Sequence, residues 1–457
     1  MKWKKWYIAF GIILFLLVVG FFNFYRTNTV NFSLPESNVS MNETISPEYM
    51  KEDIDFIVTT LREVHPKTYS GFSAEQERII KDAYKKIEKP MKVKEFYFIA
   101  NEIICSMKDA HTSMYPNTVG NRTMPLNILW LNDGMYVGND INKLKKGDKI
   151  LSIGGKDEKT ILTELAKFIP AENQQWLKVM GKNYILMEMY LEHMNLINDN
   201  KVDILVERNG EELSVSLPFI YTTGALNSNN KNWISYSIDK ENSLGIFTLN
   251  QCNFNDEYKT TLKNFFQEVA SNNIKHVAVD VRNNTGGNSM VVNEFIKYLD
   301  VSKYTSYGGD KRYSKQAKEQ RNGLFRTSGY SSGTPKKVKN EKVDDNLLFK
   351  GDVYILTSPV TFSSANWFAV IFKDNGLGTI IGEPTGNQPS SYGDILVFQT
   401  PNAQLNFSVS YKKWVRPDTS KNSEDSLYPD ILVYTKIEDI LNNRDPQIEA
   451  LKELISK

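Results

Sequence analysis

Apolar and polar positions divide the chain into segments of different period. Residues 1–27 hold an uncharged apolar stretch, Trp6 to Tyr25, which is long enough to cross a bilayer as a helix of about 20 residues. The three lysines before it predict a cytoplasmic N-terminus and an extracytoplasmic remainder. No small-x-small cleavage site follows, which favours an uncleaved anchor over a secretion signal. We therefore expect a single-pass cell-membrane protein, attached to the membrane through this helix.

The next two segments are a polar spacer and a helical region. Residues 28–45 lack a hydrophobic period, which is typical of a linker. In residues 46–120, Ser46-Pro47-Glu48 combines a capping residue, a first-turn proline and an early acid. Apolar positions at helical spacing follow, and further helices are expected at 74–87 and 93–107. The N-terminal globular region is therefore predicted to be mainly α-helical.

Residues 121–222 change to short alternating strands with turns. Strands are expected at 135–138, 149–153, 201–207 and 212–217. The run from Gly147 to Gly155, GDKILSIGG, resembles the "G-D-x-I-L-x-I-x-G" run of PDZ domains, and a helix at 160–169 would flank the groove of such a domain. No Gly-Leu-Gly-Phe-like loop is evident, so capture of a peptide terminus by this PDZ-like domain stays open.

Strand and helix patterns alternate through residues 223–457. Strands are expected at 244–249, 276–281 and 353–357, and helices at 257–270, 291–299 and 364–372. Such alternation predicts an α/β domain with a largely parallel sheet. A polar and basic insertion near 304–350 interrupts it, either as a solvated excursion or as a lid. The fold class is therefore mixed α/β.

Composition narrows the function classes. The 457 residues are enough for two or three domains. The 55 Lys and Arg residues nearly balance 54 Asp and Glu residues, which argues against a nucleic-acid partner held by a global positive field. Four scattered histidines show no H-E-x-x-H spacing, and two cysteines cannot form a four-ligand zinc site. We expect no metal and no cofactor; whether Cys105 and Cys252 pair is left open.

One serine lies where a nucleophile would be favoured. The apolar strand 353–357 is followed by a turn and by a helix with apolar residues at Ala365, Phe368, Ala369 and Phe372. Ser363 stands at the start of that helix, near unpaired backbone N–H groups and the positive end of the helix dipole. A hydroxyl there suits a reaction that produces an oxyanion. It also suits a simple N-cap.

A glycine pair supplies a second candidate. The apolar strand 277–281 runs into Asn283-Asn284-Thr285-Gly286-Gly287. Glycines permit positive φ and close approach of a substrate, so the amides of Gly286 and Gly287 could donate to a developing oxyanion. A tight turn would need the same residues, so the pattern alone does not decide.

Together these runs resemble the tail-specific, or C-terminal processing, serine peptidases. That family carries "D-x-R-x-N-x-G-G", then "T-x-S-A-x-E", then "G-E-x-T-x-G". This chain reads DVRNNTGG at 280–287, TFSSAN at 361–366 and GEPTG at 382–386, with YPDI at 428–431 similar to the family's "x-P-D-I". The resemblance implies a catalytic core of the ClpP/crotonase-like type in 223–457. It also implies that Ser363 attacks peptide bonds of polypeptide substrates.

The chain departs from the family pattern at the position of the general base. Many members have a lysine in "F-G-K-G" after the "G-E-x-T" run, where this chain reads Gly386-Asn387-Gln388-Pro389. A branch similar to the tricorn core peptidase uses histidine instead, and Asp109-Ala110-His111-Thr112 matches its "D-x-H-T" run. His111 is therefore the predicted base. His65 is its rival, and were His111 far from the serine, a lysine would be reconsidered: Lys373, Lys412 or Lys413.

A triad also needs a group that orients the imidazole. The family glutamate lies shortly before "P-D-I", so the resemblance implies Glu424, with Asp425 as the alternative. The predicted reaction is acyl transfer by Ser363, with the oxyanion held by the Gly286 or Gly287 amide and that of Ser364. Two alternatives remain. One is a catalytically inactive ligand-binding protein, suggested by the missing lysine and by Asn366 in place of the family glutamate. The other is a scaffold that captures peptides through the PDZ-like domain.

Overall fold

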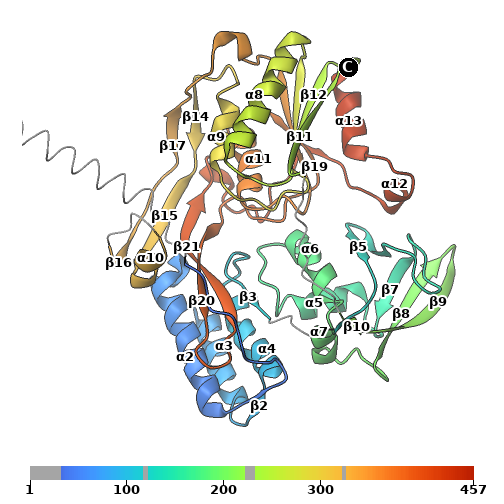
Figure 1. Cartoon of the computed structure of the whole chain (residues 1–457), viewed down its shortest axis with the longest axis vertical. Helices are drawn as coiled ribbons and strands as arrows, with labels where there is room; N and C mark the ends of the chain where they lie inside the picture. The colour runs from blue at the N-terminus through green and yellow to red at the C-terminus, as the bar shows by residue number, and fades with distance from the viewer. Residues whose placement is uncertain (1–31, 117–121, 222–231, 322–325) are drawn as a thin grey trace, which may run out of the picture.

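A computed structural model describes residues 32–116, 122–221, 232–321 and 326–457. These residues form three regions: a helical region, a small antiparallel β region, and an α/β region that carries the C-terminus (Figure 1). The mixed α/β class expected from the sequence is confirmed. The proposed anchor and the first part of the spacer lie outside the described residues.

The predicted membrane location needs correction. No helix in the described residues is both long and apolar enough to cross a membrane. The longest, α2 (Pro47–Val64), has 18 residues, but Glu48, Lys51, Glu52 and Asp53 interrupt its apolar positions. A span needs about 20 mainly apolar residues. The expected location, a single-pass membrane protein with an extracytoplasmic catalytic domain, therefore finds no support in the described residues.

The helical region follows the sequence patterns closely. It contains α2, a short turn η1 (Pro66–Thr68), α3 (Ala74–Lys86) and α4 (Val93–Cys105). As expected, Ser46 caps α2 by accepting a hydrogen bond from the N–H of Tyr49, and proline occupies the first turn. A two-stranded sheet of β1 (Thr44–Ile45) and β2 (Met91–Lys92) ties the start of α2 to the start of α4.

The β region is a five-stranded antiparallel sheet. Its strands pair in chain order: β5 (Ile128–Leu131), β6 (Gly134–Val137), β7 (Lys149–Ile153), β8 (Lys201–Arg208) and β9 (Glu211–Pro218). Between β7 and β8 lie α5 (Glu158–Leu165), α6 (Gln174–Tyr184) and α7 (Glu188–His193). β4 (Arg122–Thr123) pairs with β10 (Ile220–Tyr221) beside them. The resemblance to a PDZ domain stays a prediction.

A six-stranded sheet forms the centre of the α/β region. Its order is β11 (Ile234–Asp239), β12 (Leu244–Leu249), β13 (His276–Asp280), β18 (Asp352–Thr357), β19 (Thr379–Gly382) and β22 (Ile431–Leu432). All neighbours are parallel except β11 and β12. Because β13 and β18 are parallel neighbours, the loops after them, which carry Gly286 and Ser363, meet at one edge of the sheet.

Helices cover both faces of this sheet. One face packs against α8 (Asp256–Ser271), α9 (Met290–Ile296) and α11 (Ser364–Asp374) through a continuous apolar core. The other packs against α13 (Pro446–Ile455), whose Leu451 is fully buried. The short helix α12 (Ile437–Leu441) precedes α13. With both faces covered, the strands read as nearly unbroken apolar runs, which is why their positions could be predicted.

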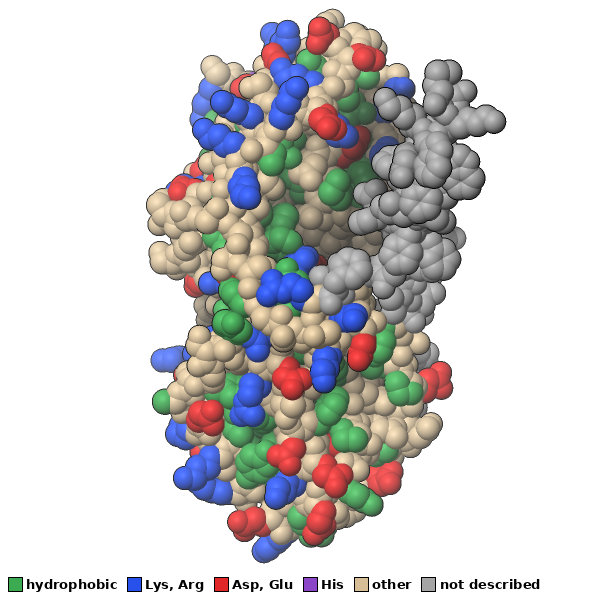
Figure 2. All heavy atoms as spheres, turned by 90° about the vertical axis from the view of Figure 1, so that its left-hand side faces the viewer, with side chains coloured by type: hydrophobic (Ala, Val, Ile, Leu, Met, Phe, Trp, Pro, Cys, Tyr) green, Lys and Arg blue, Asp and Glu red, His purple; other side chains and the backbone are tan. Residues whose placement is uncertain are grey.

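The segment predicted as a polar lid contributes strands to a second sheet. β15 (Gly308–Ser314) pairs with β16 (Ser328–Ser331) and with β21 (Asn406–Val415), which also pairs with β20 (Tyr392–Gln399) and β3 (Met114–Tyr115). The short helix α10 (Lys315–Gln320) follows β15. Two short 3-10 helices, η2 (Asp345–Leu347) and η3 (Thr419–Lys421), lie further along the chain. β14 (Lys303–Ser306) pairs with β17 (Lys336–Lys339), in the upper part of the face in Figure 2, where basic side chains are numerous. Movement as a lid stays a prediction.

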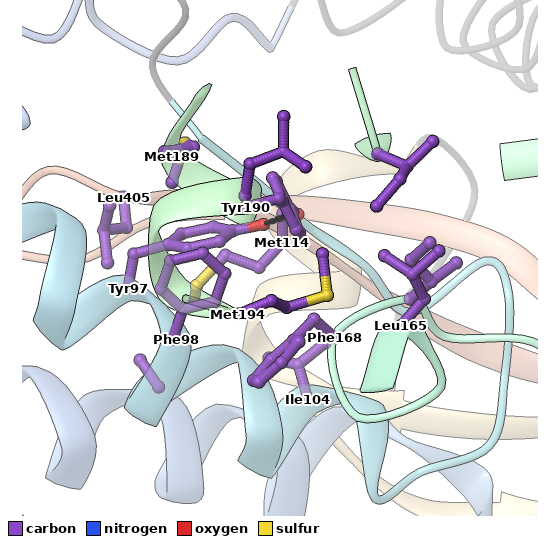
Figure 3. Close-up of a cluster of buried hydrophobic side chains, with 14 of the residues drawn as sticks. Tyr97, Phe98, Ile104, Met114, Leu165, Phe168, Met189, Tyr190, Met194 and Leu405 are labelled. Atoms are coloured by element: carbon purple, nitrogen blue, oxygen red, sulfur yellow. Dashed lines mark hydrogen bonds between the residues drawn. The ribbon is translucent and has the colours of Figure 1, made fainter. Parts of the chain in front are cut away.

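Large apolar side chains join the regions into one body. The long β20–β21 hairpin reaches down beside α2 (Figure 1), and one buried cluster continues from it into α4, α5 and α7. Figure 3 shows Tyr97 and Phe98 of α4 next to Tyr190 of α7 and Leu405 of the hairpin. The hydroxyls of Tyr97 and Tyr190 lie 2.8 Å apart. Cys105 and Cys252 are free and buried.

Candidate active site

The turn between β18 and α11 holds Ser363 in an unusual conformation. Its φ of 53° and ψ of −123° are rare for any residue but glycine. Its N–H donates to Asn387 Oδ1 at 3.0 Å, and its hydroxyl makes no capping hydrogen bond to α11. The N-cap interpretation of Ser363 therefore lacks support. The hydroxyl faces a cavity.

His111 lies beside this hydroxyl. Its Nε2 is 3.1 Å from Ser363 Oγ, although 252 residues separate the two in the chain. His111 comes from the loop that joins α4 to β3, and β3 is held in place by pairing with β21. Its ring packs against Phe362, which stacks on Trp176 of α6. All three regions thus contribute to the position of one side chain.

The electrostatic setting keeps His111 neutral. Burial lowers the pKa of the imidazole, while the negative charges of Asp109 and Asp394 oppose the shift without reversing it. A neutral imidazole can accept a proton at Nε2, as a general base must. The pair therefore has both the distance and the protonation state that deprotonation of a serine requires.

A buried carboxylate, Asp109, organises this loop. Its Oδ1 accepts the backbone N–H of His111 at 3.0 Å, and its Oδ2 accepts from the Thr112 hydroxyl at 2.6 Å. Burial raises the pKa of Asp109, but hydrogen bonds and charge interactions with its neighbours outweigh it and hold that pKa well below its usual range. Oδ1 also lies 3.8 Å from His111 Nδ1. Asp109 is thus an anion next to His111.

His65, considered above as a rival base, supports Asp109 instead. Its Nδ1 accepts the N–H of Lys67 at 3.1 Å, so the proton is on Nε2, which donates to Asp109 Oδ2 at 3.1 Å. Burial lowers the pKa of His65 and keeps it neutral. His65 therefore contacts the carboxylate behind the site.

The predicted triad acid, Glu424, does not reach His111. Its Oε2 accepts from Arg416 at 2.6 Å, and Arg416 also pairs with the buried Asp374 at 2.6 Å. The physical reason is that a fully buried guanidinium must be neutralised, and Glu424 supplies part of that charge. The alternative acid, Asp425, accepts from the Tyr428 hydroxyl at 2.9 Å. Among the described residues His111 Nδ1 has no hydrogen-bond partner.

The lysines considered as substitutes for the base have other contacts. Lys373 pairs with Asp430 at 2.8 Å and Lys412 pairs with Asp394. The Lys413 ammonium lies 5.9 Å from the ring centroid of Tyr392. None of the three donates a hydrogen bond to Ser363 in the described part of the chain.

A second carboxyl group, Glu172, was missed by the sequence analysis. It lies just before the N-cap of α6, and Asp109, His111 and Glu172 each place one polar atom within 4.8 Å of the others. Burial and the charge of Asp109 raise the pKa of Glu172 to about 8. Its Oε2 is buried and has no partner among the described residues. The three atoms have the spacing of metal ligands, but the acyl transfer considered above requires no metal. No local motif marks Glu172.

Two backbone N–H groups, those of Gly287 and Ser364, are candidates for an oxyanion site. Gly286, the other glycine considered as a donor, is excluded from this role because its N–H already donates to Asn284 Oδ1 at 2.8 Å. The N–H groups of Gly287 and Ser364 have no acceptor in the described residues. The Ser364 hydroxyl donates to Gly287 O at 2.8 Å and so links the two segments. A Cβ on Gly287, whose φ is 135°, would lie 2.4 Å from Cys252 O, so this position needs glycine.

A cavity of about 500 Å³ opens in front of the pair. One side is aromatic, with Trp367, Trp414 and Tyr392, and charged groups from Arg321 and Asp394 also line it. Trp367 stacks on Tyr307 at 3.9 Å and meets Trp414 edge to face at 4.9 Å, which makes that wall rigid. An aromatic wall with a few polar groups suits a side chain of a polypeptide.

Two comparisons with known proteins gave matches. Residues 243–433, less than half of the chain, match the model of peptidase family S41; this stretch is similar to that family, and the match supports a serine-type peptidase. No curated protein matches the sequence.

Solved structures show the fold over most of the chain. CPAF in complex with lactacystin has a TM-score of 0.67 at 15% identity, over 90% of this chain and 98% of that one. Mature CPAF gives 0.66 at 14% identity, over 90% and 96%. A protein from Parabacteroides merdae gives 0.50 at 14%, over 90% and 97%. At these identities the likeness concerns the fold.

Proposed function

We propose that this protein is an active serine peptidase that cleaves polypeptides through an acyl-enzyme. The observation that carries the proposal is the 3.1 Å contact between His111 Nε2 and Ser363 Oγ. The strained backbone of Ser363 supports it, because such strain concentrates at functional sites. The family match of residues 243–433 supports the same reaction class.

Each group has one role in this mechanism. His111 removes the hydroxyl proton as Ser363 Oγ attacks the peptide carbonyl carbon. The N–H groups of Gly287 and Ser364 donate to the resulting oxyanion. His111 then returns the proton to the leaving amine, and water hydrolyses the acyl-enzyme with His111 again as base. Asp109, the anion nearest to Nδ1, favours the imidazolium that forms in each step. Glu424 has no part in it.

A fluorophosphonate probe tests the nucleophile directly. We expect covalent labelling of Ser363 in the wild-type protein and none in Ser363→Ala. Cleavage of an unfolded polypeptide such as denatured casein should fall by about 10³-fold or more in Ser363→Ala and in His111→Ala. Ser271→Ala, at the exposed end of α8, is the matched control and should behave as wild type.

The outcome separates an enzyme from a binding protein on the same scaffold. If neither labelling nor cleavage depends on Ser363, the catalytic proposal is wrong and the inactive alternative takes its place. That alternative would still bind a polypeptide in the cavity beside Trp367. Binding without turnover, measured by fluorescence anisotropy of a labelled peptide, would identify it.

A further inference from the structure

A second cavity, of about 390 Å³, lies behind the catalytic pair. Lys67, Lys108 and Lys413 line it together with Glu172 and Tyr392. Tyr392 also lines the cavity in front of Ser363, so this one ring forms part of both walls. The second cavity is thus next to the site but separate from the nucleophile.

The three lysines make no direct ion pair within the described part of the chain. None forms an ion pair with a carboxylate in the described residues, whereas two nearby basic side chains do: Lys412 pairs with Asp394 and Arg416 pairs with Asp374. Burial and the charge of Lys108 lower the pKa of Lys67; the charges of Asp109 and Glu75 oppose this shift without reversing it, and that of Lys413 adds to it. The three ammonium groups therefore repel one another around one hollow. An anion between them would relieve that repulsion.

The rest of the lining supplies further hydrogen-bond donors. The pKa of Glu172 is raised to about 8, chiefly by burial, so near pH 7 its carboxyl group keeps its proton and can donate. Gln388 and Asn422 contribute side-chain amides to the same cavity. Ammonium, amide and protonated carboxyl groups around one hollow match an oxyanion better than a cation or an apolar group.

From this arrangement we infer that Lys67, Lys108 and Lys413 form a binding pocket for an oxyanion group, either a carboxylate or a phosphate. The group has two possible sources. It is an acidic side chain or terminal carboxylate of a polypeptide that also occupies the catalytic cavity, or it is a free ion. Binding of the anion itself does not depend on Ser363 being catalytic.

The pocket is mechanically connected to the base. The Lys67 ammonium donates to Met107 O at 2.8 Å, and the Lys67 N–H donates to His65 Nδ1. Lys108 immediately precedes Asp109, and its φ is 50°. An anion held by these two lysines would therefore fix the segment that carries Asp109 and His111. Occupancy should make that segment less mobile.

Inorganic phosphate is the first probe. Calorimetric titration at constant ionic strength should show saturable binding to the wild-type chain, weakened at least tenfold in the triple variant Lys67→Gln, Lys108→Gln, Lys413→Gln. The matched control is Lys143→Gln, Lys146→Gln, Lys149→Gln, which removes the same charge from exposed positions of the β region. Since Lys67 also supports Met107, the double variant Lys108→Gln, Lys413→Gln repeats the test with that contact intact.

Equal phosphate binding by wild type and both pocket variants would overturn the inference, as would no binding to wild type. The source is then found with the Ser363→Ala protein and a peptide carrying Glu or Gln at one position. Tighter binding of the Glu peptide, reversed by phosphate, identifies the substrate as the source. If the two peptides bind equally well and the protein still binds phosphate, the source of the oxyanion group is the free ion. Because Ser363→Ala serves in every peptide arm, failure of catalysis leaves these results readable.

Discussion

The backbone conformation of Ser363 is the residue-level feature most closely tied to the proposed function. A φ of 53° with ψ of −123° costs about 1–3 kcal/mol for a residue with a side chain. Gly286 packs closely against this turn. A Cβ added to Gly286 would lie 2.6 Å from the Cβ of Ser363, so only glycine fits beside the serine in this conformation.

The first prediction concerns this strain. Ser363→Gly should raise the free energy of unfolding by about 1 kcal/mol, because glycine adopts positive φ readily but loses more chain entropy on folding. It should have no peptidase activity. Ser363→Ala is the control; it keeps the strain and should match the wild-type stability within about 0.5 kcal/mol. Urea unfolding measures both. Equal stability of the glycine and alanine variants would contradict the assignment of strain.

The second prediction is the pH dependence of kcat/KM. The base must be neutral, so activity is present above the pKa of His111 and is lost as pH falls through it. Burial lowers that pKa from its ordinary value, about 6.5. The acidic limb should therefore have its midpoint below 6.5. Asp109→Asn removes a charge that raises this pKa, so the limb should move to still lower pH. A midpoint above 7 in the wild-type protein would contradict the model of the base.

At the residue level the sequence singled out Ser363 and His111, which lie 3.1 Å apart, but not the groups that surround them. Ser363 and His111 lie in runs that resemble family motifs. Glu172 lies in an irregular segment, and only the packing of α6 against the catalytic loop brings it near His111. Glu424 was expected to be the triad acid because it lies shortly before Tyr428-Pro429-Asp430. Nothing in the sequence indicated that Arg416 would be buried and would need a counter-ion.

Among the elements, Arg416 and its two acids connect a strand to a helix. Arg416 follows β21, Asp374 ends α11, and Glu424 lies in the loop after η3. The guanidinium and Asp374 are fully buried, whereas the side chain of Glu424 is 31% exposed. Losing the partly exposed partner therefore costs much less than losing the guanidinium, which would leave Asp374 buried and unpaired.

The third prediction separates this structural role from catalysis. Glu424→Gln should keep kcat/KM within about threefold of wild type and lower stability by about 1 kcal/mol or less. Arg416→Ala should lower stability by about 3–5 kcal/mol. Steady-state kinetics at pH 7 and denaturant unfolding measure the two effects. A loss of 10² or more in kcat/KM for Glu424→Gln, with stability unchanged, would restore Glu424 as the triad acid.

Element positions were predictable because their patterns are local. The strands of the parallel sheet are apolar on both faces, and the expected strand 244–249 matches β12. The sequence signal that caps α2 is likewise local, and so is the pattern that marks the start of α11. The pairing of β15 with β21 could not be foreseen, since the polar sequence of β15 carries no core pattern and its partner lies about 100 residues away.

On the scale of the whole molecule, the proposed base, His111, and the proposed nucleophile, Ser363, belong to different regions. The buried cluster that includes Tyr97, Phe168 and Leu405 joins them, as Figure 3 shows for the contact of α4 with α7. Hydrogen bonds add to it: buried Asp53 of α2 accepts the N–H groups of Asn402 and Ala403 in the β20–β21 hairpin. The helical region therefore shares a buried core with the β20–β21 hairpin.

The fourth prediction follows from this shared core. Residues 232–457 expressed alone should be aggregation-prone and unreactive toward a fluorophosphonate, because the hairpin loses its apolar cover and Ser363 loses its base. Co-expression with residues 32–221 should restore a soluble complex in which Ser363 is labelled. The same pair carrying His111→Ala is the control and should be soluble but unlabelled. Size-exclusion chromatography and probe labelling give the two readouts; strong labelling of the isolated C-terminal fragment would show that the α/β region needs no base from outside itself.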